Sequence, residues 1–328
     1  MNILELSEQE IVRRNSLNRL REMGIDAYPA EEFVVDAWSE EVKANFSDDA
    51  AEPRQVRMAG RVMSRRIMGK ASFMELQDSK GRIQVYVNRD ELCPDEDKTL
   101  YNEVFKKLLD IGDFVGVPGF VFRTQTGEIS IPAKSLKPLP IVKQKDGVTN
   151  AAFDDPELRY RQRYVDLIVN DGVKDTFLKR ATIVKTLRSV LDEAGYTEVE
   201  SPTLQAIAGG ASARPFITHF NALHIPMYMR IATELYLKRL IVGGFEGVYE
   251  IGKNFRNEGM DRNHNPEFTC TELYVQYKDY YWMMCFTEQL LEKICVAVNG
   301  TTDVTIDGKT ISFKAPYRRL PILDAIKE

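Results

Sequence analysis

Hydrophobic and polar residues alternate most regularly between positions 247 and 277, in GVYEIGKNFRNEGMDRNHNPEFTCTELYVQY. Because side chains in a strand point alternately to two sides, this period predicts two strands joined by a charged loop. The expected apolar side of the pair carries Tyr249, Ile251, Phe255, Leu273, Val275 and Tyr277. The opposite side carries Glu250, Gly252, Asn254, Arg256, Phe268, Cys270, Glu272, Tyr274 and Gln276. A sheet face of this composition suggests a bound ligand.

The chemistry of that polar side favours a nucleotide held beside a cationic small molecule. Arg256 is a permanently charged fork suited to a phosphate or a carboxylate. Phe268 offers a ring on which a base can stack. Two possible acceptors for a cation follow on the second strand, Glu272 and Tyr274. The alternative is a hairpin with a solvated polar side, in which Arg256 only pairs with Glu250 or Glu258.

Residues 56–134 show the same alternation in shorter runs, which predicts a small all-β unit. The expected strands are VRMAGRVMSRRI, SFMELQD, RIQVYV, FVGVPGFVF and EISIPAK, with a helical pattern at 97–110 between the third and fourth. This order is typical of an OB-fold barrel, a common binder of single-stranded nucleic acid. Phe73 would supply a stacking ring, accompanied by Arg65, Arg66 and Gln84. Alternatively, Phe73 belongs to the barrel core.

Helical patterns account for much of the remaining chain. A capping box at Ser7 begins a helix that Gly24 ends. Further helices are expected at 156–169, 173–195, 233–242 and 283–298. Thr233 is the expected N-cap of the helix at 233–242. A hairpin is expected in TTDVTIDGKTISF, with its turn at Asp307-Gly308.

Composition narrows the class of protein. The 328 residues, 44% hydrophobic and 28% charged, are enough for two globular domains. The net charge is −5, so a nucleic-acid partner would need local basic patches. No apolar run has membrane-spanning length and no signal pattern begins the chain, so we expect a cytoplasmic protein without membrane contact. The four cysteines lack metal or disulfide spacing and are expected to be buried and reduced.

Residues 255–269, FRNEGMDRNHNPEFT, resemble motif 2 of the class II aminoacyl-tRNA synthetases, and both ends of the segment resemble the bacterial lysine-specific family. The segments 60–87, 159–170, 209–223 and 227–259 resemble the same family. This resemblance implies an α+β protein with an N-terminal OB-fold β-barrel and a partial class II antiparallel-sheet catalytic domain. The expected parts are an N-terminal helix and connecting segment (1–55), an OB-fold anticodon-binding domain (56–140), a linker (141–152) and the catalytic domain (153–328).

The resemblance implies an activity and a set of site residues. Members of this family react L-lysine with ATP to give lysyl-adenylate and pyrophosphate. They then transfer the lysine to tRNA(Lys). Arg256 would be catalytic, bridging the α-phosphate and the lysine carboxylate. The implied ATP-binding residues are Arg256, Glu258, His264, Asn265 and Phe268. The implied lysine-binding residues are Gly210, Glu234, Arg256, Glu272 and Tyr274.

Two of these residues have a simpler explanation in the sequence alone. Glu234 falls in the first turn of a helix, where the helix dipole favours a carboxylate without any function. Gly210 lies in a loop of small residues that is either a plain turn or a place of close approach to a ligand.

The resemblance also implies contacts with a tRNA and with a second copy of the chain. The implied anticodon-binding residues are Arg66, Phe73, Gln84 and Glu128. Residues 173–202 resemble motif 1, which forms the dimer interface in class II enzymes and implies a homodimer. Without the family, these residues are a core-packing helix followed by a strand.

The resemblance fails at the end of the chain. Nothing after Lys314 resembles motif 3, so we expect a truncated synthetase with incomplete activity. The Mg²⁺ used by this family is held by glutamates of that later region, so no metal ligand is expected here. Asn263 stands where some bacterial relatives carry an arginine, which weakens the expected phosphate contact there. The alternatives are a non-catalytic tRNA-binding fragment or regulatory paralogue, and a relative that lysylates a translation factor but lacks the barrel.

Overall fold

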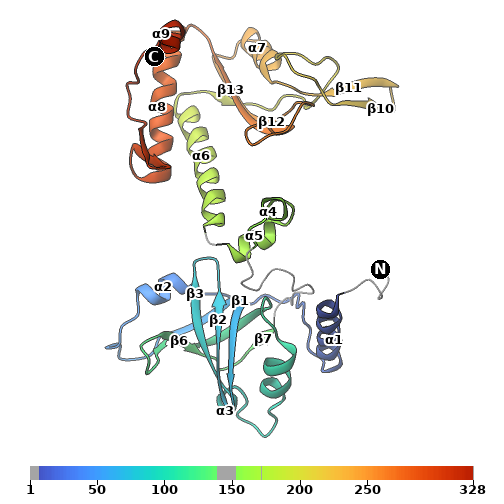
Figure 1. Ribbon diagram of the computed structural model, residues 1–328, viewed down its shortest axis with the longest axis vertical. Helices are drawn as coiled ribbons and strands as arrows, with labels where there is room; N and C mark the ends of the chain where they lie inside the picture. Colours follow the sequence, from blue (N-terminus) through green and yellow to red (C-terminus); the bar gives the residue numbers. More distant parts are fainter. Residues whose placement is uncertain (1–6, 139–152, 171, 328) are drawn as a thin grey trace. The chain divides into compact units, whose positions relative to one another are not determined.

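The computed structural model describes residues 7–138, 153–170 and 172–327 of the chain. The chain divides into two compact units, Met1–Asp171 (unit 1) and Gly172–Glu328 (unit 2), each of which is described by itself (Figure 1). The expected linker at 141–152 lies outside the described residues.

The sheet of unit 1 has seven strands in the order β5-β6-β3-β2-β1-β4-β7. The strands are β1 (Gln55–Met68), β2 (Ala71–Gln77), β3 (Arg82–Asn88), β4 (Phe114–Phe120), β5 (Phe122–Arg123), β6 (Ile129–Pro132) and β7 (Lys137–Pro138). Buried and half-buried residues alternate along β2 and β3. One side of these strands therefore faces the core, which includes Leu76, Val85 and Ile131, and the other side is partly exposed. The fourth predicted strand divides at Val121, whose N–H donates to the carbonyl of Arg54 at 2.9 Å.

The sheet curls until β4 and the end of β6 approach each other. Lys134 N–H donates to the Pro118 carbonyl at 3.1 Å, and a Cβ on Gly119 would lie 2.3 Å from the Pro132 carbonyl oxygen. Pro118 and Pro132 have no N–H group and cannot extend this contact into a ladder. Among the described strands, β5 and β7 remain sheet edges. The sheet is therefore curled as expected for the OB-fold barrel, and no continuous ladder joins β4 to β6.

Two helices of unit 1 rest on one another and on the sheet. The expected helix before β4 is η2 (Leu100–Leu108), which is wound as a π-helix, and α3 (Arg89–Leu92) precedes it. The first helix, α1 (Glu8–Glu22), has the predicted capping box at Ser7 and packs on η2 through Leu17, Leu20, Val104 and Leu108. The buried guanidinium of Arg13 donates to Asp113 at 2.6 Å, which fixes α1 to the loop before β4.

Three further helices of unit 1 differ from the prediction. The connecting segment expected after the N-terminal helix contains a further helix, α2 (Ser39–Ala44). The single helix expected at 156–169 is two helices, α4 (Pro156–Arg161) and α5 (Arg163–Val169). They separate at Gln162, whose φ and ψ of −118° and 53° are not helical.

Unit 2 is built around the predicted pair of long strands. The strands β12 (Gly247–Phe255) and β13 (Glu267–Val275) are antiparallel, and β8 (Thr197–Glu198) joins β12 in parallel. The helices α6 (Val173–Glu193) and α8 (Tyr280–Asn299) lie side by side (Figure 1). They cover the apolar side of the strand pair, where Tyr249, Ile251, Leu273 and Val275 meet Leu191, Trp282 and Phe286. The apolar side was predicted correctly except for Tyr277, which lies beyond β13 and is 92% exposed.

The other elements of unit 2 are short. Helix α7 (Glu234–Val242) follows Thr233, and α9 (Ile322–Lys327) is the last helix. The hairpin of β14 (Asp303–Ile306) and β15 (Lys309–Ser312) turns at Asp307 and Gly308 as predicted, with φ of 50° and 76°. A small sheet of β10 (Ile217–Phe220), β11 (Ile225–Met229) and β9 (Leu204–Gln205) was not predicted.

Two expectations from composition concern membranes and cysteines. No helix within the described ranges combines the length and the apolar character needed to cross a membrane. All four cysteines are free thiols. Cys93 and Cys295 are buried as expected, whereas Cys270 is half-buried and Cys285 is exposed, so the expectation of buried thiols is wrong for these two.

Candidate functional site

The polar side of the β12–β13 pair brings together the residues that its alternation predicts. Four cross-strand pairs share this side: Val248 with Tyr274, Glu250 with Glu272, Gly252 with Cys270, and Asn254 with Phe268. Arg256 follows directly after β12, and its N–H donates to the Pro266 carbonyl at 2.8 Å, which continues the pairing into the loop. The antiparallel register therefore places an arginine, a phenyl ring and carboxylates on one surface.

Arg256 and Phe268 form a cation–π pair on this surface. The guanidinium carbon of Arg256 lies 5.1 Å from the centroid of the Phe268 ring. Arg256 Nε is buried and has no hydrogen-bond partner among the described residues. The alternative in which Arg256 pairs with Glu250 or Glu258 is wrong, because Glu250 binds Arg230 and Glu258 accepts from the Arg214 backbone at 3.1 Å. The donors of Arg256 therefore remain available to an anion.

A buried ion pair that the sequence did not reveal lies beneath this surface. Arg230 and Glu250 form a salt bridge and are 5% and 4% exposed. Arg230 also donates to the Lys253 carbonyl at 2.8 Å and to the Ser201 carbonyl at 3.1 Å, and Ser201 Oγ donates to Glu250 at 2.6 Å. Because both charged side chains have several hydrogen-bond partners, the ion pair is expected to be rigid. No sequence pattern distinguishes Arg230 from an exposed arginine.

Gly252 is required above this ion pair. A Cβ at position 252 would lie 2.2 Å from Arg230 Nη2. A glycine in a strand often marks such a close approach of another group. The sequence placed Gly252 on the polar side but gave no reason for a glycine there.

The acidic residues expected to meet a cation lie together at the β13 end of the surface. Tyr274 donates its O–H to Glu272 at 3.1 Å. Glu234, in the first turn of α7, pairs with Lys238, and the Lys238 ammonium lies 5.9 Å from the centroid of the Tyr274 ring. The Lys238 ammonium therefore lies among these acidic residues. The second oxygen of Glu272 accepts from the Thr233 N–H at 3.5 Å.

Burial affects the ionisation of two groups on this surface. Desolvation and the neighbouring charge of Glu272 raise the pKa of Tyr274 well above its usual value. Tyr274 is therefore a neutral hydrogen-bond donor at neutral pH. Burial, together with Glu272, also raises the pKa of the Cys270 thiol, so this cysteine is protonated.

Gly210 approaches the acidic end from a separate loop. Its φ is +87°, and a Cβ there would lie 3.1 Å from Ala232 Cβ and 3.2 Å from Glu234 Cβ. The position therefore favours glycine both for its backbone conformation and for the space available. Thr233 occupies the N-cap position, but its side chain makes no cap hydrogen bond. Its buried hydroxyl has no partner among the described residues.

The remaining predicted residues, Glu258, His264 and Asn265, lie on the charged loop after β12 and are exposed. Glu258 accepts from Arg214 N–H, and Asn257 N–H donates back to the Arg214 carbonyl at 2.7 Å. His264 is 74% exposed and pairs with Asp261 at 2.8 Å. Backbone N–H groups, first that of Asn263, hold the pKa of Asp261 below its usual range. His264 and its exposed neighbour Asn265 thus lie on the outer part of the loop.

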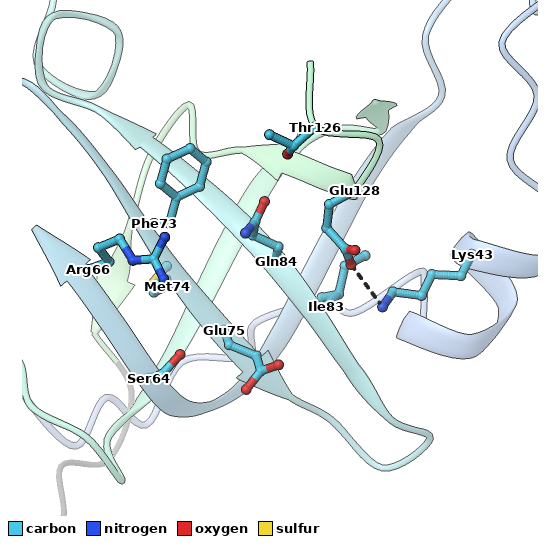
Figure 2. Close-up of a pocket in the computed structure, with 10 residues that line it drawn as sticks. All are labelled: Lys43, Ser64, Arg66, Phe73, Met74, Glu75, Ile83, Gln84, Thr126 and Glu128. Carbon is cyan, nitrogen blue, oxygen red and sulfur yellow. Dashed lines mark hydrogen bonds and ion pairs between the residues drawn. The ribbon is translucent and has the colours of Figure 1, made fainter. Parts of the chain in front are cut away.

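Unit 1 contains a separate pocket of about 420 Å³ on the outer side of its sheet (Figure 2). Its lining consists of Lys43, Ser64, Arg66, Phe73, Met74, Glu75, Ile83, Gln84, Thr126 and Glu128. All four residues implied as anticodon contacts therefore line one cavity. Ser64, Thr126 and Lys43 are lining residues that the sequence did not single out.

Phe73 lies on the outer side of β2. Its neighbours Ser72 and Met74 are buried, while Phe73 itself is half-buried. The alternative that places Phe73 in the core is therefore wrong. Arg66 is its cross-strand partner on β1, and Figure 2 shows both side chains on the same side of the sheet. Gln84 accepts from the buried Ser130 hydroxyl at 2.8 Å, which orients the Gln84 amide.

Lys43 closes the pocket on the side of α2. Its ammonium pairs with Glu128 at 3.2 Å (Figure 2). Helix α2 is held against the turn between β2 and β3, where Asp78 accepts from the backbone N–H of Ser39 at 2.6 Å and from its hydroxyl at 2.8 Å. Lys43 comes from the segment expected only to connect the first helix to the sheet, and no sequence signal marked it.

No group of three or more His, Cys, Asp or Glu side chains in the described part of the chain is placed to hold a metal ion.

Two family models match the chain, one over most of the unit 1 sheet and one over the β12–β13 pair. The family model described as "OB-fold nucleic acid binding domain" matches residues 56–139. The family model described as "tRNA synthetases class II (D, K and N)" matches residues 155–328, which is more than half of the chain. The chain belongs to the class II tRNA synthetases of the D, K and N group.

The relatives of this synthetase are closely similar to it. It is 64% identical to a lysine–tRNA ligase of Porphyromonas gingivalis strain W83, over 100% of this chain and 58% of the relative. It is 62% identical to a lysine–tRNA ligase of Azobacteroides pseudotrichonymphae, over 98% of this chain and 66% of the relative. It is 60% identical to a lysine–tRNA ligase of Christiangramia forsetii, over 99% of this chain and 58% of the relative. The chain thus spans about three fifths of the length of these relatives.

Proposed function

We propose that this chain forms the anticodon-binding part and much of the amino-acid-activating site of a lysine–tRNA ligase. The observation that carries the proposal is the common surface of Arg256, Phe268, Glu272 and Tyr274, which offers an anion fork, a base platform and acceptors for a cation. The lysine–tRNA ligases to which the chain is 60% to 64% identical support lysine as the amino acid.

Activation of lysine begins when its carboxylate oxygen attacks the α-phosphorus of ATP and pyrophosphate leaves. Both reactants are anionic, so a fixed positive charge between them lowers the barrier. Arg256 supplies that charge by binding the α-phosphate and the lysine carboxylate at once. Phe268 supports the adenine ring, and Glu258 accepts from the adenine amino group. His264 and Asn265 face the outer phosphates from the loop.

Recognition of lysine relies on the acidic end of the surface. Glu272 and the neutral Tyr274 bind the ε-ammonium, and Glu234 binds the α-amino group while Gly210 approaches through its backbone. The ion pair between Glu234 and Lys238 must then break, or the Glu234 carboxylate must bind Lys238 and the α-amino group at once. Two carboxylates and a phenol suit lysine, whereas an aspartate substrate would require a cation at this end.

The pocket of unit 1 binds one unpaired base of the tRNA(Lys) anticodon. Phe73 stacks on the base, Arg66 lies beside it, and Gln84 and Glu128 read its hydrogen-bonding edge. The four residues line one cavity on the outer side of the sheet, which supports this assignment.

The proposal includes a homodimer formed through α6 and β8, the region that resembles motif 1, and a cytoplasmic location. Several large apolar side chains of α6 are exposed, including Leu178 and Ile183 at 53% and 39%. Sedimentation at micromolar concentration tests the dimer. The Mg²⁺ that the resemblance implies would neutralise phosphate charge; no group of three or more His, Cys, Asp or Glu side chains among the described residues is placed to hold it.

Lysine-dependent exchange of pyrophosphate into ATP tests the activation step. We expect exchange with lysine and none with aspartate or asparagine, the other amino acids of this synthetase group. A chain that only binds tRNA would give no exchange with any amino acid. Exchange driven equally by aspartate would contradict the assignment of Glu272 and Tyr274.

A further inference from the structure

We propose that the end of the β10–β11 hairpin in unit 2 binds one divalent transition-metal ion through the imidazole rings of His219 and His224 (Figure 1). We call these two residues the histidine pair. The inference goes beyond the proposed function and does not rest on it, because the histidine pair belongs neither to the activation surface nor to the unit 1 pocket. The ion is of the class that binds well to imidazole nitrogen, such as Zn²⁺, Ni²⁺ or Cu²⁺.

The register of the hairpin brings the two rings of the histidine pair together. His219 on β10 is the cross-strand partner of Pro226 on β11. His224 comes two residues before Pro226 and is therefore a diagonal neighbour of His219. Diagonal neighbours across an antiparallel pair are close enough for aromatic side chains to meet. The two ring centroids are accordingly 6.2 Å apart.

The backbone fixes where the two rings begin. The ladder continues as far as Phe220 and Ile225, so a tight loop connects the strands. His224 ends this loop with a φ of +55°, in the left-handed region that histidine adopts more readily than most residues with a Cβ. The ladder and the loop therefore set both Cα positions, while the two exposed rings can turn towards an ion.

The distance between the rings suits a shared metal ion. A metal–imidazole bond of about 2.0 to 2.1 Å places the ion about 3.2 Å from the ring centroid. An ion bound to both rings then holds their centroids about 5.2 Å apart in tetrahedral geometry and about 6.4 Å apart when the two nitrogens are opposite each other. The observed separation of 6.2 Å lies within this range. Small rotations of the side chains therefore bring both nitrogens to one ion.

Both imidazoles of the histidine pair are available to a ligand. Within the described parts of the chain, neither has a hydrogen-bond or ion-pair partner. The third histidine differs, because the His264 ring pairs with Asp261 at 2.8 Å. Imidazole is the commonest metal ligand in proteins, so two unpaired rings facing each other favour a metal over other ligands.

The spacing of the histidine pair is that of half a zinc site. HFNALH, residues 219–224, has the spacing of the two histidines of a zinc finger. The accompanying cysteine pair is missing from the sequence, so the spacing alone predicted no metal site. Because the protein supplies two ligands, water completes the coordination and the ion is exchangeable rather than structural.

Isothermal titration calorimetry of the whole chain with Ni²⁺ alone tests the proposal, in a buffer without thiols or chelators. We expect one ion to bind per chain. His219→Asn and His224→Asn should each weaken binding by at least about tenfold, because each removes one of the two protein ligands. Excess Mg²⁺ should not compete, since it prefers oxygen ligands.

His264→Asn is the matched control. It removes the remaining histidine of the chain but keeps the histidine pair, so it should bind Ni²⁺ as the unaltered chain does. Thermal unfolding without metal checks that each variant remains folded. All three substitutions replace exposed side chains and should leave the unfolding temperature nearly unchanged.

Several results would overturn the proposal. Absence of Ni²⁺ binding to the unaltered chain would refute the site directly. Equal binding by all variants would place the ion elsewhere, for example at the half-buried Cys270 or the exposed Cys285. A loss caused by only one of the two hairpin substitutions would show that the rings do not share an ion. Half an ion per chain would mean that the metal bridges two copies instead of closing one hairpin.

Discussion

The guanidinium of Arg256 lies 5.1 Å from the centre of the Phe268 ring, although the charged loop separates the two residues in the sequence. The antiparallel register explains this, since Asn254 is paired with Phe268 and Arg256 follows on the same side. Stacking on the ring restricts a long side chain before any ligand arrives, which reduces the entropy that binding must overcome. The guanidinium and the ring are therefore positioned as one unit.

Arg256→Lys should lower lysine-dependent pyrophosphate exchange by about a hundredfold or more, because an ammonium cannot hold a phosphate and a carboxylate in one plane. The exchange rate at saturating ATP and lysine measures this. Arg262→Lys, on the exposed loop, is the matched control and should change the rate little. Equal rates for both variants would show that Arg256 does not contact the reacting groups.

Phe73→Ala should weaken binding of tRNA(Lys) by roughly tenfold, the cost of losing one base–ring stack. Lysine activation should be unchanged, because Phe73 belongs to unit 1 and the activation surface to unit 2. Filter binding of the tRNA and pyrophosphate exchange measure the two effects. A parallel loss of both would mean that Phe73 supports folding rather than RNA binding.

Gly252→Ala should lower the free energy of unfolding of unit 2 by about 3 kcal/mol, since the new methyl group must displace the buried Arg230 from its partners. Gly259→Ala is the control, because a Cβ at position 259 meets nothing within 4 Å, and its effect should stay within about 0.5 kcal/mol. Urea denaturation measures both values. A Gly252→Ala variant as stable as Gly259→Ala would show that the Arg230–Glu250 pair is not rigid.

Asp166 should contribute stability that disappears in acid. Burial opposes its charge, but hydrogen bonds from Asn170 and Arg159 and the charges of Arg159 and Arg163 outweigh this and hold the pKa of Asp166 below its usual range. A lowered folded-state pKa means that the stabilisation is present above the unfolded-state pKa of about 3.9 and is lost as the pH falls through the folded-state value.

Asp166→Asn should therefore destabilise unit 1 at pH 7, and the difference from the unaltered chain should shrink as the pH falls below about 4. Thermal unfolding between pH 7 and pH 3 measures this. The exposed Asp154→Asn is the control and should give no such pattern. A pH-independent difference would mean that Asp166 acts by shape rather than by charge.

The sequence predicted the features that repeat over many residues. Alternation gave both long strands and their packed and polar sides, because nine-residue strands sample that period several times. The sheet of β9, β10 and β11 was missed because its strands are short and mostly exposed, so no alternation marks them. The break between α4 and α5 at Gln162 was missed because no proline or glycine marks it in the sequence.

The candidate sites were likewise predicted only where their residues are close along the chain or on paired strands. Residues on one strand or its partner, such as Phe73 and Arg66, were placed together correctly by local pairing. Partners from distant segments were not found, because charge alone does not say which residue it meets. Glu250 was expected on an open surface and is instead buried against Arg230. Lys43 reaches its pocket only through the attachment of α2 to Asp78.

The hydrogen bond between Arg214 N–H and Glu258 links the loop that carries Gly210 to the carboxylate assigned to adenine. Only the second oxygen of Glu258 is free of that bond, so an incoming adenine amino group either shares the carboxylate or releases the loop. If the loop is released, the affinity for lysine depends on whether ATP is present, and thermodynamic reciprocity requires lysine to change the affinity for ATP by the same factor. This one side chain would then couple the binding of the two substrates.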